Sequence, residues 1–212
     1  MLRMEFMTTI MLIRHGENDS IGRYLPGQRP GLHLNAAGQE QARQIGLSLA
    51  DVPVSRVISS PMERAMETAV PLAEARNLRI EIHPGFTEMH PGDWTGRSFS
   101  DLNNDPAWAK LRSDPDTCGY PGGEDFNETQ QRLWTALQEV LDQEAIEKGI
   151  TAIFSHADCI RLLLAKALEI PLKRYNRLMI DTASLSILVF RKNLIILDGQ
   201  NLRLPFAWQP RK

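Results

Sequence analysis

The chain has 212 residues, a formal net charge of -2 and a sequence pI near 6.2. Hydrophobic residues make up 42% of the chain and charged residues 24%, which is typical of a globular protein and excludes a disordered or fibrous one. Because the net charge is small, we expect no nucleic-acid partner and no attraction to an anionic membrane. Affinity for an anion must therefore come from a local cluster of positive side chains.

The length predicts one α/β domain over residues 1–212, because a single hydrophobic core can serve a chain of this size. No run of about eighteen apolar residues indicates a membrane span. The two cysteines, Cys118 and Cys159, are too few for a disulfide framework or a four-cysteine zinc site. Glu5 interrupts the apolar opening of the chain, which argues against a signal peptide. We therefore expect a cytoplasmic protein.

Short runs of apolar and β-branched residues predict strands, and periodic patterns between most of them predict helices. The strands are expected at residues 8–13, 54–59, 78–83, 150–154, 184–190 and 194–197. The helices are expected at residues 36–50, 61–76, 125–147 and 158–168. Because strand and helix alternate, we predict a three-layer sandwich with a mainly parallel central sheet. A tight turn at residues 191–193 predicts that the last two strands pair antiparallel at one edge.

One segment, residues 84–125, fits neither pattern. It is rich in Gly, Pro, Asp, Asn and Trp and is too long for a simple connection, which predicts a helical or loop insertion over the active site. Its basic residues Arg97, Lys110 and Arg112 either contact a substrate or lie on a solvated helix face. Its tryptophans are predicted to pack rather than to hold a cofactor.

Reactive side chains follow several of the predicted strands. Arg14, His15 and Glu17 come directly after the first strand. Arg64 lies in the first turn of the helix after the second strand, and His156 follows the fourth. Ligands of open α/β sheets bind at the carboxyl ends of the strands, so we expect these groups to meet there. Two guanidinium groups and two imidazole rings predict an anion site, and arginine can grip phosphate oxygens through two parallel hydrogen bonds.

The spacing of residues in the sequence excludes several other kinds of catalytic or cofactor-binding site. A cysteine phosphatase needs arginine six residues after its cysteine, but Glu124 follows Cys118 at that distance and Ala165 follows Cys159. The chain also lacks a phosphate loop, an H-E-x-x-H helix, a G-x-S-x-G elbow and a dinucleotide fingerprint. We therefore expect no cofactor and no metal.

Five segments stand in a particular order along the chain: 13–17 (IRHGE), 59–69 (SSPMERAMETA), 88–96 (EMHPGDWTG), 121–124 (PGGE) and 155–161 (SHADCIR). Together they resemble the motifs of the histidine phosphatase superfamily, also called phosphoglycerate mutase-like, whose first signature is RHG. The resemblance covers nearly the whole chain in the expected order. It implies the fold predicted above and a phosphatase acting on a small phosphomonoester.

The resemblance also implies a mechanism and assigns roles to five residues. His15 would attack phosphorus, and Arg14, Arg64 and His156 would hold the oxygens of the transferring group. Glu88 would protonate the leaving oxygen and later remove a proton from water. This agrees with the physical requirement that histidine attack as neutral imidazole, a form that neighbouring positive charges favour by lowering its pKa.

The sequence departs from the family pattern at three places. Ala157 stands where the family usually has glycine, at a position whose backbone should approach phosphate. Ile21 stands where an asparagine often contacts phosphate, and Asn18 is the candidate that supplies this contact instead. Pro91 replaces an aromatic residue commonly seen in the acid motif. We expect these changes to affect substrate and rate more than family membership.

Some assignments have competitors. Asp93 or Glu17 could be the acid in place of Glu88, and Asp158 could orient His156, although it is expected to cap a helix. The remaining histidines are predicted to lie at the surface or at the rim of the site; they are His33, His83 and His90.

Three functions are compatible with the sequence. The first is a metal-independent phosphatase, and the second is a phosphoglycerate mutase, which returns the phosphoryl group to a sugar-acid hydroxyl. The third is a non-catalytic protein that binds a phosphorylated ligand, suggested by Ala157 and Ile21. Neither the identity of the phosphomonoester nor the number of subunits follows from the sequence.

Overall fold

The protein is described here by a computed structural model that covers residues 7–147, 149–192, 194–203 and 205. A single six-stranded sheet has the strand order β3-β2-β4-β1-β5-β6. The strands are β1 (Met7–Arg14), β2 (Val54–Ser59), β3 (Ile80–Ile82), β4 (Ile150–Ser155), β5 (Leu185–Arg191) and β6 (Leu194–Leu202). Within the described residues, no helix has the length and apolarity that a membrane span requires.

The pairing of the strands confirms the predicted sheet. β1 pairs in parallel with β4, and β2 pairs in parallel with both β3 and β4. β5 runs antiparallel to β1, and β6 runs antiparallel to β5 at the edge of the sheet. The sheet is therefore mainly parallel with an antiparallel pair at one edge. Of the predicted turn that joins this pair, Asn193 lies outside the described residues.

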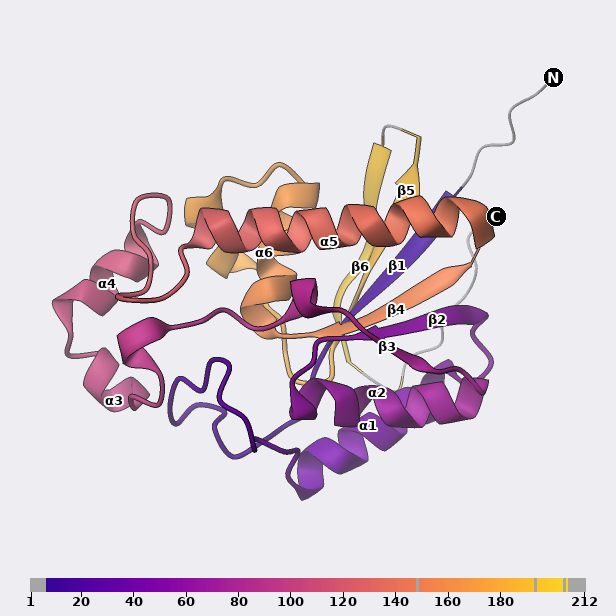
Figure 1. Cartoon of the computed structure of the whole chain (residues 1–212), viewed down its shortest axis with the longest axis horizontal. Helices are drawn as coiled ribbons and strands as arrows, with labels where there is room; N and C mark the ends of the chain where they lie inside the picture. The colour runs from indigo at the N-terminus through magenta and orange to yellow at the C-terminus, as the bar shows by residue number, and fades with distance from the viewer. Residues whose placement is uncertain (1–6, 148, 193, 204, 206–212) are drawn as a thin grey trace.

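Two helical layers cover the two faces of the sheet (Figure 1). The long helices are α1 (Ala36–Leu49), α2 (Glu63–Arg76), α5 (Phe126–Glu147) and α6 (Ala157–Ala167). Alternation along β1 explains both layers, because successive side chains of a strand point to opposite faces. Ile10 and Leu12 pack in the cluster with α5 and α6, whereas Met11 and Ile13 pack in the cluster with α1 and α2. The predicted three-layer sandwich is confirmed.

Some predicted boundaries shift by a few residues. α2 begins at Glu63 rather than at residue 61, because Met62 still has extended backbone angles and serves as its N-cap. β3 is only three residues long, although its apolar pattern predicts a strand from residue 78. Pro71 lies inside α2, and the helix continues beyond it to Arg76.

The segment 84–125 contains short helices and an aromatic cluster. Its helices are η1 (Pro84–Phe86), η2 (Gly92–Trp94), α3 (Phe99–Leu102) and α4 (Pro106–Ser113). The ring of Trp94 meets those of Trp108 and Tyr120 edge to face, at centroid distances of 5.7 Å and 6.0 Å. Both tryptophans are buried in the core cluster, which confirms that they pack. α3 and α4 occupy the end of the molecule toward which β1, β2 and β4 point (Figure 1).

Candidate active site

The carboxyl ends of the three central parallel strands finish at one level. The backbone N–H of His15, just after β1, donates to the carbonyl of Ser155 at 3.0 Å. The N–H of Ser60, just after β2, donates to the carbonyl of Phe154 at 2.9 Å. Residues that follow these strands therefore share one place in the fold. The structure brings together the groups that the sequence analysis selected.

His15 is buried, with 4% of its surface exposed, and its ring is oriented by its own loop. Nδ1 lies 2.7 Å from the carbonyl oxygen of Gly16, which can only accept, so Nδ1 carries the proton. Nε2 is then left with a lone pair for attack. Burial lowers the pKa of His15 well below its usual value, and the charges of Arg64 and Arg14 lower it further. The ring is therefore held in its neutral form.

Close backbone packing fixes the loop that carries His15. A Cβ atom on Gly38, in the first turn of α1, would lie 2.0 Å from the carbonyl oxygen of Glu17. Only glycine permits this approach. The N–H of Gly16 donates to Thr68 Oγ1 at 2.9 Å, which ties the loop to α2 as well. Thr68 had no predicted role, and its presence in the second motif was the only signal for it.

His156 is fully buried at the N-terminus of α6, and its ring centroid lies 5.3 Å from that of His15. Its Nε2 lies 2.8 Å from the hydroxyl of Ser60, which itself accepts a hydrogen bond from the N–H of Met62 at 3.3 Å. The hydroxyl can therefore donate to Nε2, and in that arrangement the ring proton is on Nδ1. Burial and then Arg64 lower the pKa of His156 well below its usual value.

Two residues beside His156 differ from what the sequence suggests. Asp158 does not cap α6, because the N-cap is His156 and no side chain caps the helix there. Asp158 instead pairs with Arg161 at 2.8 Å. Ala157 is the first residue of α6, and its methyl group packs against the hydrophobic cluster around α5 and α6. Its N–H lies in the first turn of the helix, where amides have no partner within the helix.

The two arginines present unpaired donors. Arg64 is fully buried and donates through Nη2 to the carbonyl of Gly27 at 3.0 Å. Arg14 donates through Nη1 to the carbonyl of Ile180 at 2.8 Å. Within this group of site residues, four buried nitrogen atoms have no hydrogen-bond partner in the described part of the chain: Arg14 Nε, Arg64 Nε, Arg64 Nη1 and His156 Nδ1. Burying such donors without a partner costs free energy, so their arrangement fits an anion that accepts from all of them.

Asn18 lies beside His15, whereas Ile21 lines a separate cavity. Asn18 is buried, and its Oδ1 accepts from the N–H and hydroxyl of Ser20 at 3.0 Å and 2.6 Å. Its Nδ2 lies 3.5 Å from His15 Nδ1. Because that nitrogen already donates to the carbonyl of Gly16, the two N–H groups do not hydrogen-bond to each other. Ile21 is 38% exposed and lines a cavity of about 460 Å³ that reaches Arg14. The amide donor near the site is thus that of Asn18.

Glu88 reaches the histidines from the loop after η1. Its Oε2 lies 3.7 Å from His156 Nδ1, while its Oε1 accepts from the N–H of Met89 at 2.9 Å and lies 3.5 Å from Cys159 Sγ. The side chain is 18% exposed. Burial, followed by the nearby carboxylate of Asp158, raises the pKa of Glu88 above its usual value. Glu88 is therefore the carboxyl group suited to carry a proton here.

The competing acids point elsewhere. Glu17 Oε1 accepts from Asn35 Nδ2 at 3.0 Å, at the N-cap of α1. The carboxylate of Asp93 lies next to Gly122, where a Cβ atom would be 3.1 Å from its Oδ1. The other histidines also have separate surroundings: His33 pairs with Glu67, His83 pairs with Glu139, and His90 is exposed. Among the described residues, no group of three or more His, Cys, Asp or Glu side chains could hold a metal ion.

Comparison with known protein families shows which family this chain belongs to. The sequence model of the histidine phosphatase superfamily (branch 1) matches residues 10–202. The chain belongs to this superfamily. Among relatives, it is 30% identical over 183 residues to the "Probable phosphoglycerate mutase GpmB" of Serratia proteamaculans, covering 85% of this chain and 84% of that protein. It is also 34% identical over 142 residues to an uncharacterized protein of Mycobacterium tuberculosis, covering 62% of this chain and 65% of the relative.

Solved structures of histidine phosphatases share the fold. The mycobacterial glucosyl-3-phosphoglycerate phosphatase is 25% identical, with a TM-score of 0.82 over 92% of this chain and 99% of that one. The alpha-ribazole phosphatase from Shigella flexneri is 26% identical, with a TM-score of 0.83 over 96% of this chain and 100% of that one. The chain spans only half of a bifunctional protein of M. tuberculosis that it matches at 30% identity. Phosphatases and mutases of small phosphorylated compounds are thus both among its relatives.

Proposed function

We propose that this histidine phosphatase superfamily member hydrolyses a small phosphomonoester through a phosphohistidine on His15. One observation carries the proposal: unpaired, buried N–H groups of Arg14, Arg64 and His156 surround a histidine whose Nε2 is free to attack. Such preorganised donors stabilise the charge on a transferring phosphoryl group without any rearrangement during the reaction.

The first half of the reaction transfers the phosphoryl group to the protein. His15 Nε2 donates its lone pair to phosphorus, and the bond from phosphorus to the ester oxygen breaks. The leaving oxygen takes the bond electrons and a proton from Glu88, so an alcohol departs and Glu88 becomes a carboxylate. Burial favours the protonated carboxyl that this step requires, because it raises the pKa of Glu88.

The second half returns the protein to its initial state. Water attacks phosphorus, Glu88 takes one of its protons, and the bond between phosphorus and Nε2 breaks to release inorganic phosphate. Arg14, Arg64 and His156 keep their contacts with the phosphoryl oxygens throughout. We further propose a cytoplasmic location, supported by the two free cysteines, Cys118 and Cys159.

The GpmB relative makes a phosphoglycerate mutase the second candidate. In a mutase the phosphohistidine returns its phosphoryl group to a hydroxyl of the substrate rather than to water. The two solved phosphatases favour hydrolysis. Assays of phosphosugars, phosphoglycerates, nucleotides and phosphoamino acids, with phosphate release and isomerisation followed in parallel, separate the two. Isomerisation without phosphate release identifies a mutase, and phosphate binding without turnover identifies a binding protein.

The phosphohistidine is directly testable. A labelled substrate should leave phosphate on His15, and the label should be lost in acid and kept in alkali, as a phosphorus–nitrogen bond requires. His15→Ala should remove both the label and turnover while the circular dichroism spectrum of the protein is kept. Label found on Ser, Asp or Cys would overturn the mechanism.

We also propose that the reaction needs no metal ion, since arginines and histidines supply the positive charge that metals supply elsewhere. Turnover should therefore survive exhaustive treatment with EDTA. Loss of activity in EDTA that a divalent ion restores would contradict this.

A further inference from the structure

One arginine, Arg132, hydrogen-bonds to the backbone beside the loop that carries Glu88. Residues 87–91 lie between η1 and η2 and have no regular secondary structure of their own. Arg132, on α5, donates through Nη1 to the carbonyls of Gly85 at 2.9 Å and Thr87 at 3.1 Å. The same guanidinium therefore grips the chain immediately before Glu88. An irregular loop gains a defined position from contacts of this kind.

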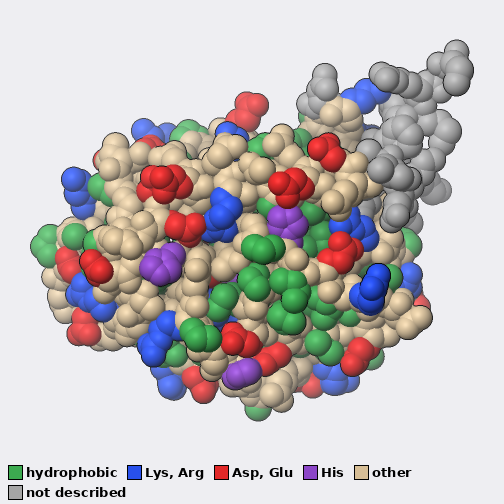
Figure 2. Space-filling model, viewed as in Figure 1, with side chains coloured by type: hydrophobic (Ala, Val, Ile, Leu, Met, Phe, Trp, Pro, Cys, Tyr) green, Lys and Arg blue, Asp and Glu red, His purple; other side chains and the backbone are tan. Residues whose placement is uncertain are grey.

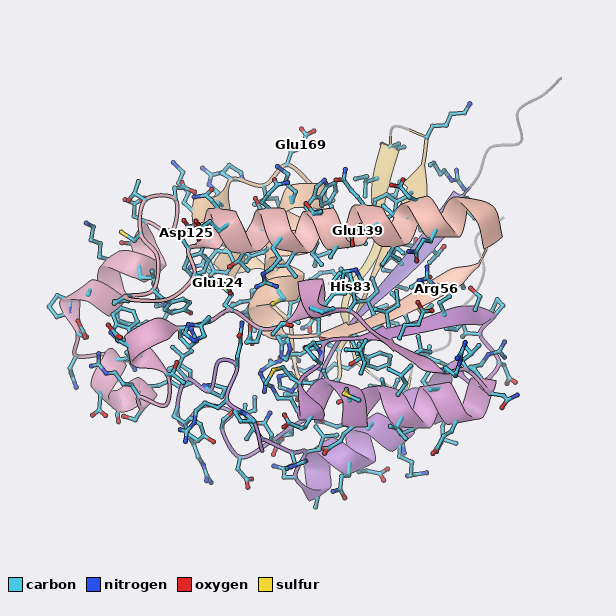
Figure 3. The ribbon with its side chains drawn as sticks, viewed as in Figure 1. Arg56, His83, Glu124, Asp125, Glu139 and Glu169 are labelled. Atoms are coloured by element: carbon cyan, nitrogen blue, oxygen red, sulfur yellow. The ribbon has the colours of Figure 1, made fainter. Side chains whose placement is uncertain are left out.

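The other nitrogen atoms of the Arg132 guanidinium bind the carboxylate of Glu124, which in turn binds the backbone just after Glu88. Arg132 donates through Nε and Nη2 to the two oxygens of Glu124, both at 3.0 Å. Glu124 Oε2 also accepts from the backbone N–H of His90 at 2.8 Å, and the N–H of Glu124 donates to the carbonyl of His90 at 2.9 Å. Figure 3 shows Glu124 just before the start of α5. Both flanks of Glu88 are thus tied to one forked ion pair.

The glycines before Glu124 allow this contact. A Cβ atom on Gly123 would lie 2.2 Å from the carbonyl oxygen of His90. A Cβ atom on Gly92 would lie 2.0 Å from the carbonyl oxygen of Pro121, and Gly92 has φ of +54°. These distances are impossible for other residues without a shift of the backbone. The segment 121–124 therefore serves to bring Glu124 against the loop.

Such a contact matters because proton transfer depends on position. The acid oxygen, Glu88 Oε2, must face the bound phosphomonoester beside His156, and a displacement of about 1 Å can cost roughly a hundredfold in rate. The Arg132 and Glu124 side chains are 27% and 26% exposed, so the pair is partly shielded from water. A bidentate pair fixes orientation as well as distance, which a lysine could not do.

We propose that Arg132 and Glu124 form a clamp that positions Glu88 for proton transfer. The inference rests on the proposed function, in which Glu88 is the general acid. Arg132 and Glu124 act through Glu88 and are positioning residues rather than catalytic ones. The mechanism leaves the PGGE segment, residues 121–124, without a role. In this proposal the segment positions Glu88 and does not contact the phosphate.

The test compares two leaving groups in Arg132→Met. A sugar or alkyl phosphate needs a proton on its leaving oxygen, whereas p-nitrophenyl phosphate hardly does. Arg132→Met should lower kcat/KM for the alkyl substrate about ten- to a hundredfold and that for p-nitrophenyl phosphate less than about threefold. Arg56→Met is the matched control, because Arg56 forms a similar fork with Glu81 at 3.0 Å and 2.7 Å. Figure 3 shows Arg56 at the far end from Glu124, and its loss should leave both values unchanged.

A double-mutant cycle separates positioning from a general loss of structure. Once Glu88→Gln has removed the acid, adding Arg132→Met should lower kcat/KM for the alkyl substrate by less than about threefold, since little proton transfer remains to be positioned. Glu124→Gln keeps the shape of the carboxylate but loses its charge. It should show the same preference for p-nitrophenyl phosphate to a smaller extent, and it replaces Arg132→Met if that variant does not fold.

The outcomes distinguish a wrong assignment of the acid from a wrong assignment of the clamp. If Glu88→Gln slows both substrates equally, the assignment of the acid fails and the clamp fails with it. If Glu88→Gln shows the leaving-group dependence and the clamp variants slow both substrates equally or not at all, only the clamp is wrong. Full additivity of the two substitutions would also overturn it.

Discussion

The proposed mechanism needs His15 and Glu88 in opposite protonation states at the same pH, and burial favours both. Burial disfavours the charged form of any group, so it lowers the pKa of His15 and raises that of Glu88. The histidine is then neutral and able to attack, while the carboxyl keeps its proton for the leaving group. Arg64 strengthens the effect on His15 and opposes it on Glu88. The approach of a phosphate dianion would offset that opposition.

We predict that Glu88→Gln slows the enzyme according to the basicity of the leaving oxygen. A departing alkoxide needs a proton in the transition state, so hydrolysis of sugar phosphates or phosphoglycerates should fall by roughly two to four orders of magnitude. With p-nitrophenyl phosphate, the first step should change little and the second should slow. A burst of nitrophenol in rapid-mixing experiments, followed by accumulated phosphoenzyme, measures this.

Equal losses with both leaving groups in the first step would give Glu88 a structural or binding role. Asp93→Asn and Glu17→Gln, compared with the same two substrates, then test the remaining carboxylates. Glu17 is hydrogen-bonded to Asn35.

The residues that sequence could and could not predict differ in how they act. Arg14, His15 and His156 lie at or just after strand ends, and Arg64 lies in the first turn of the helix that follows β2. A reactive side chain at such a place suggests chemistry, and the structure places the four together. Ser60 acts on His156 through a hydroxyl, and serine is too common near strand ends to be singled out. Thr68 and Arg132 lie inside helices, where a threonine or an arginine carries no signal until the partner across the fold is known.

At the scale of elements, α1 meets the loop after β1 without any space for a side chain. The backbone of Glu17 lies where a Cβ atom of residue 38 would be, so only glycine fits there. The helical pattern of α1 is readable from the sequence, yet the reason for its first-turn glycine is not, because it depends on a neighbour twenty-one positions earlier in the chain. Segment 84–125 is similar: its aromatic packing is long-range, so its composition predicts an insertion but not its helices.

We predict that Gly38→Ala damages catalysis as well as stability. The added methyl group must displace the Glu17 backbone and with it the loop that orients His15. Unfolding in urea should show a loss of about 1–3 kcal/mol, as for overpacking elsewhere, and kcat should fall at least about tenfold.

Gly46→Ala provides the matched control for this effect. Gly46 is buried in the same helix, and its Cβ atom would lie 2.8 Å from the carbonyl oxygen of Pro71 in α2, away from the His15 loop. This substitution should cost stability and leave kcat unchanged. Equal losses of kcat in both variants would show that general loosening of α1, rather than the His15 loop, is responsible.

At the scale of the whole molecule, the positive charge of the site is not a property of the surface. The net charge is -2, and acidic and basic side chains are interspersed over the face shown in Figure 2. Arg64 and His156 have no exposed surface at all. Attraction of a phosphorylated substrate therefore depends on a short-range field inside the fold, which composition could not reveal but the order of motifs could.

The same burial predicts that acid weakens the folded state in a defined pH window. The pKa values of His15 and His156 are lowered well below 6.5 by folding, so an unfolded chain binds more protons as pH falls below 6.5. Stability should be unaffected by these groups above that pH and should fall below it, by at most about 1.4 kcal/mol per pH unit for each histidine. Glu88 opposes this, because its raised pKa gives the folded state the extra proton, but it is one group against two.

Urea unfolding between about pH 7 and pH 5, in a buffer without phosphate, isolates this effect. Carboxylates with a lowered pKa, such as Asp181, weaken the fold only below about pH 4.5, and the ion pair that raises the pKa of His33 contributes fully below 6.5. His15→Ala and His156→Asn should each reduce the slope of stability against pH, because each removes one buried group that must take up a proton. Added phosphate should raise stability in the parent protein, since it binds only the folded site. A parent profile that stays flat down to pH 5, and that His15→Ala and His156→Asn leave unchanged, would mean that burial does not lower the pKa values of the two rings.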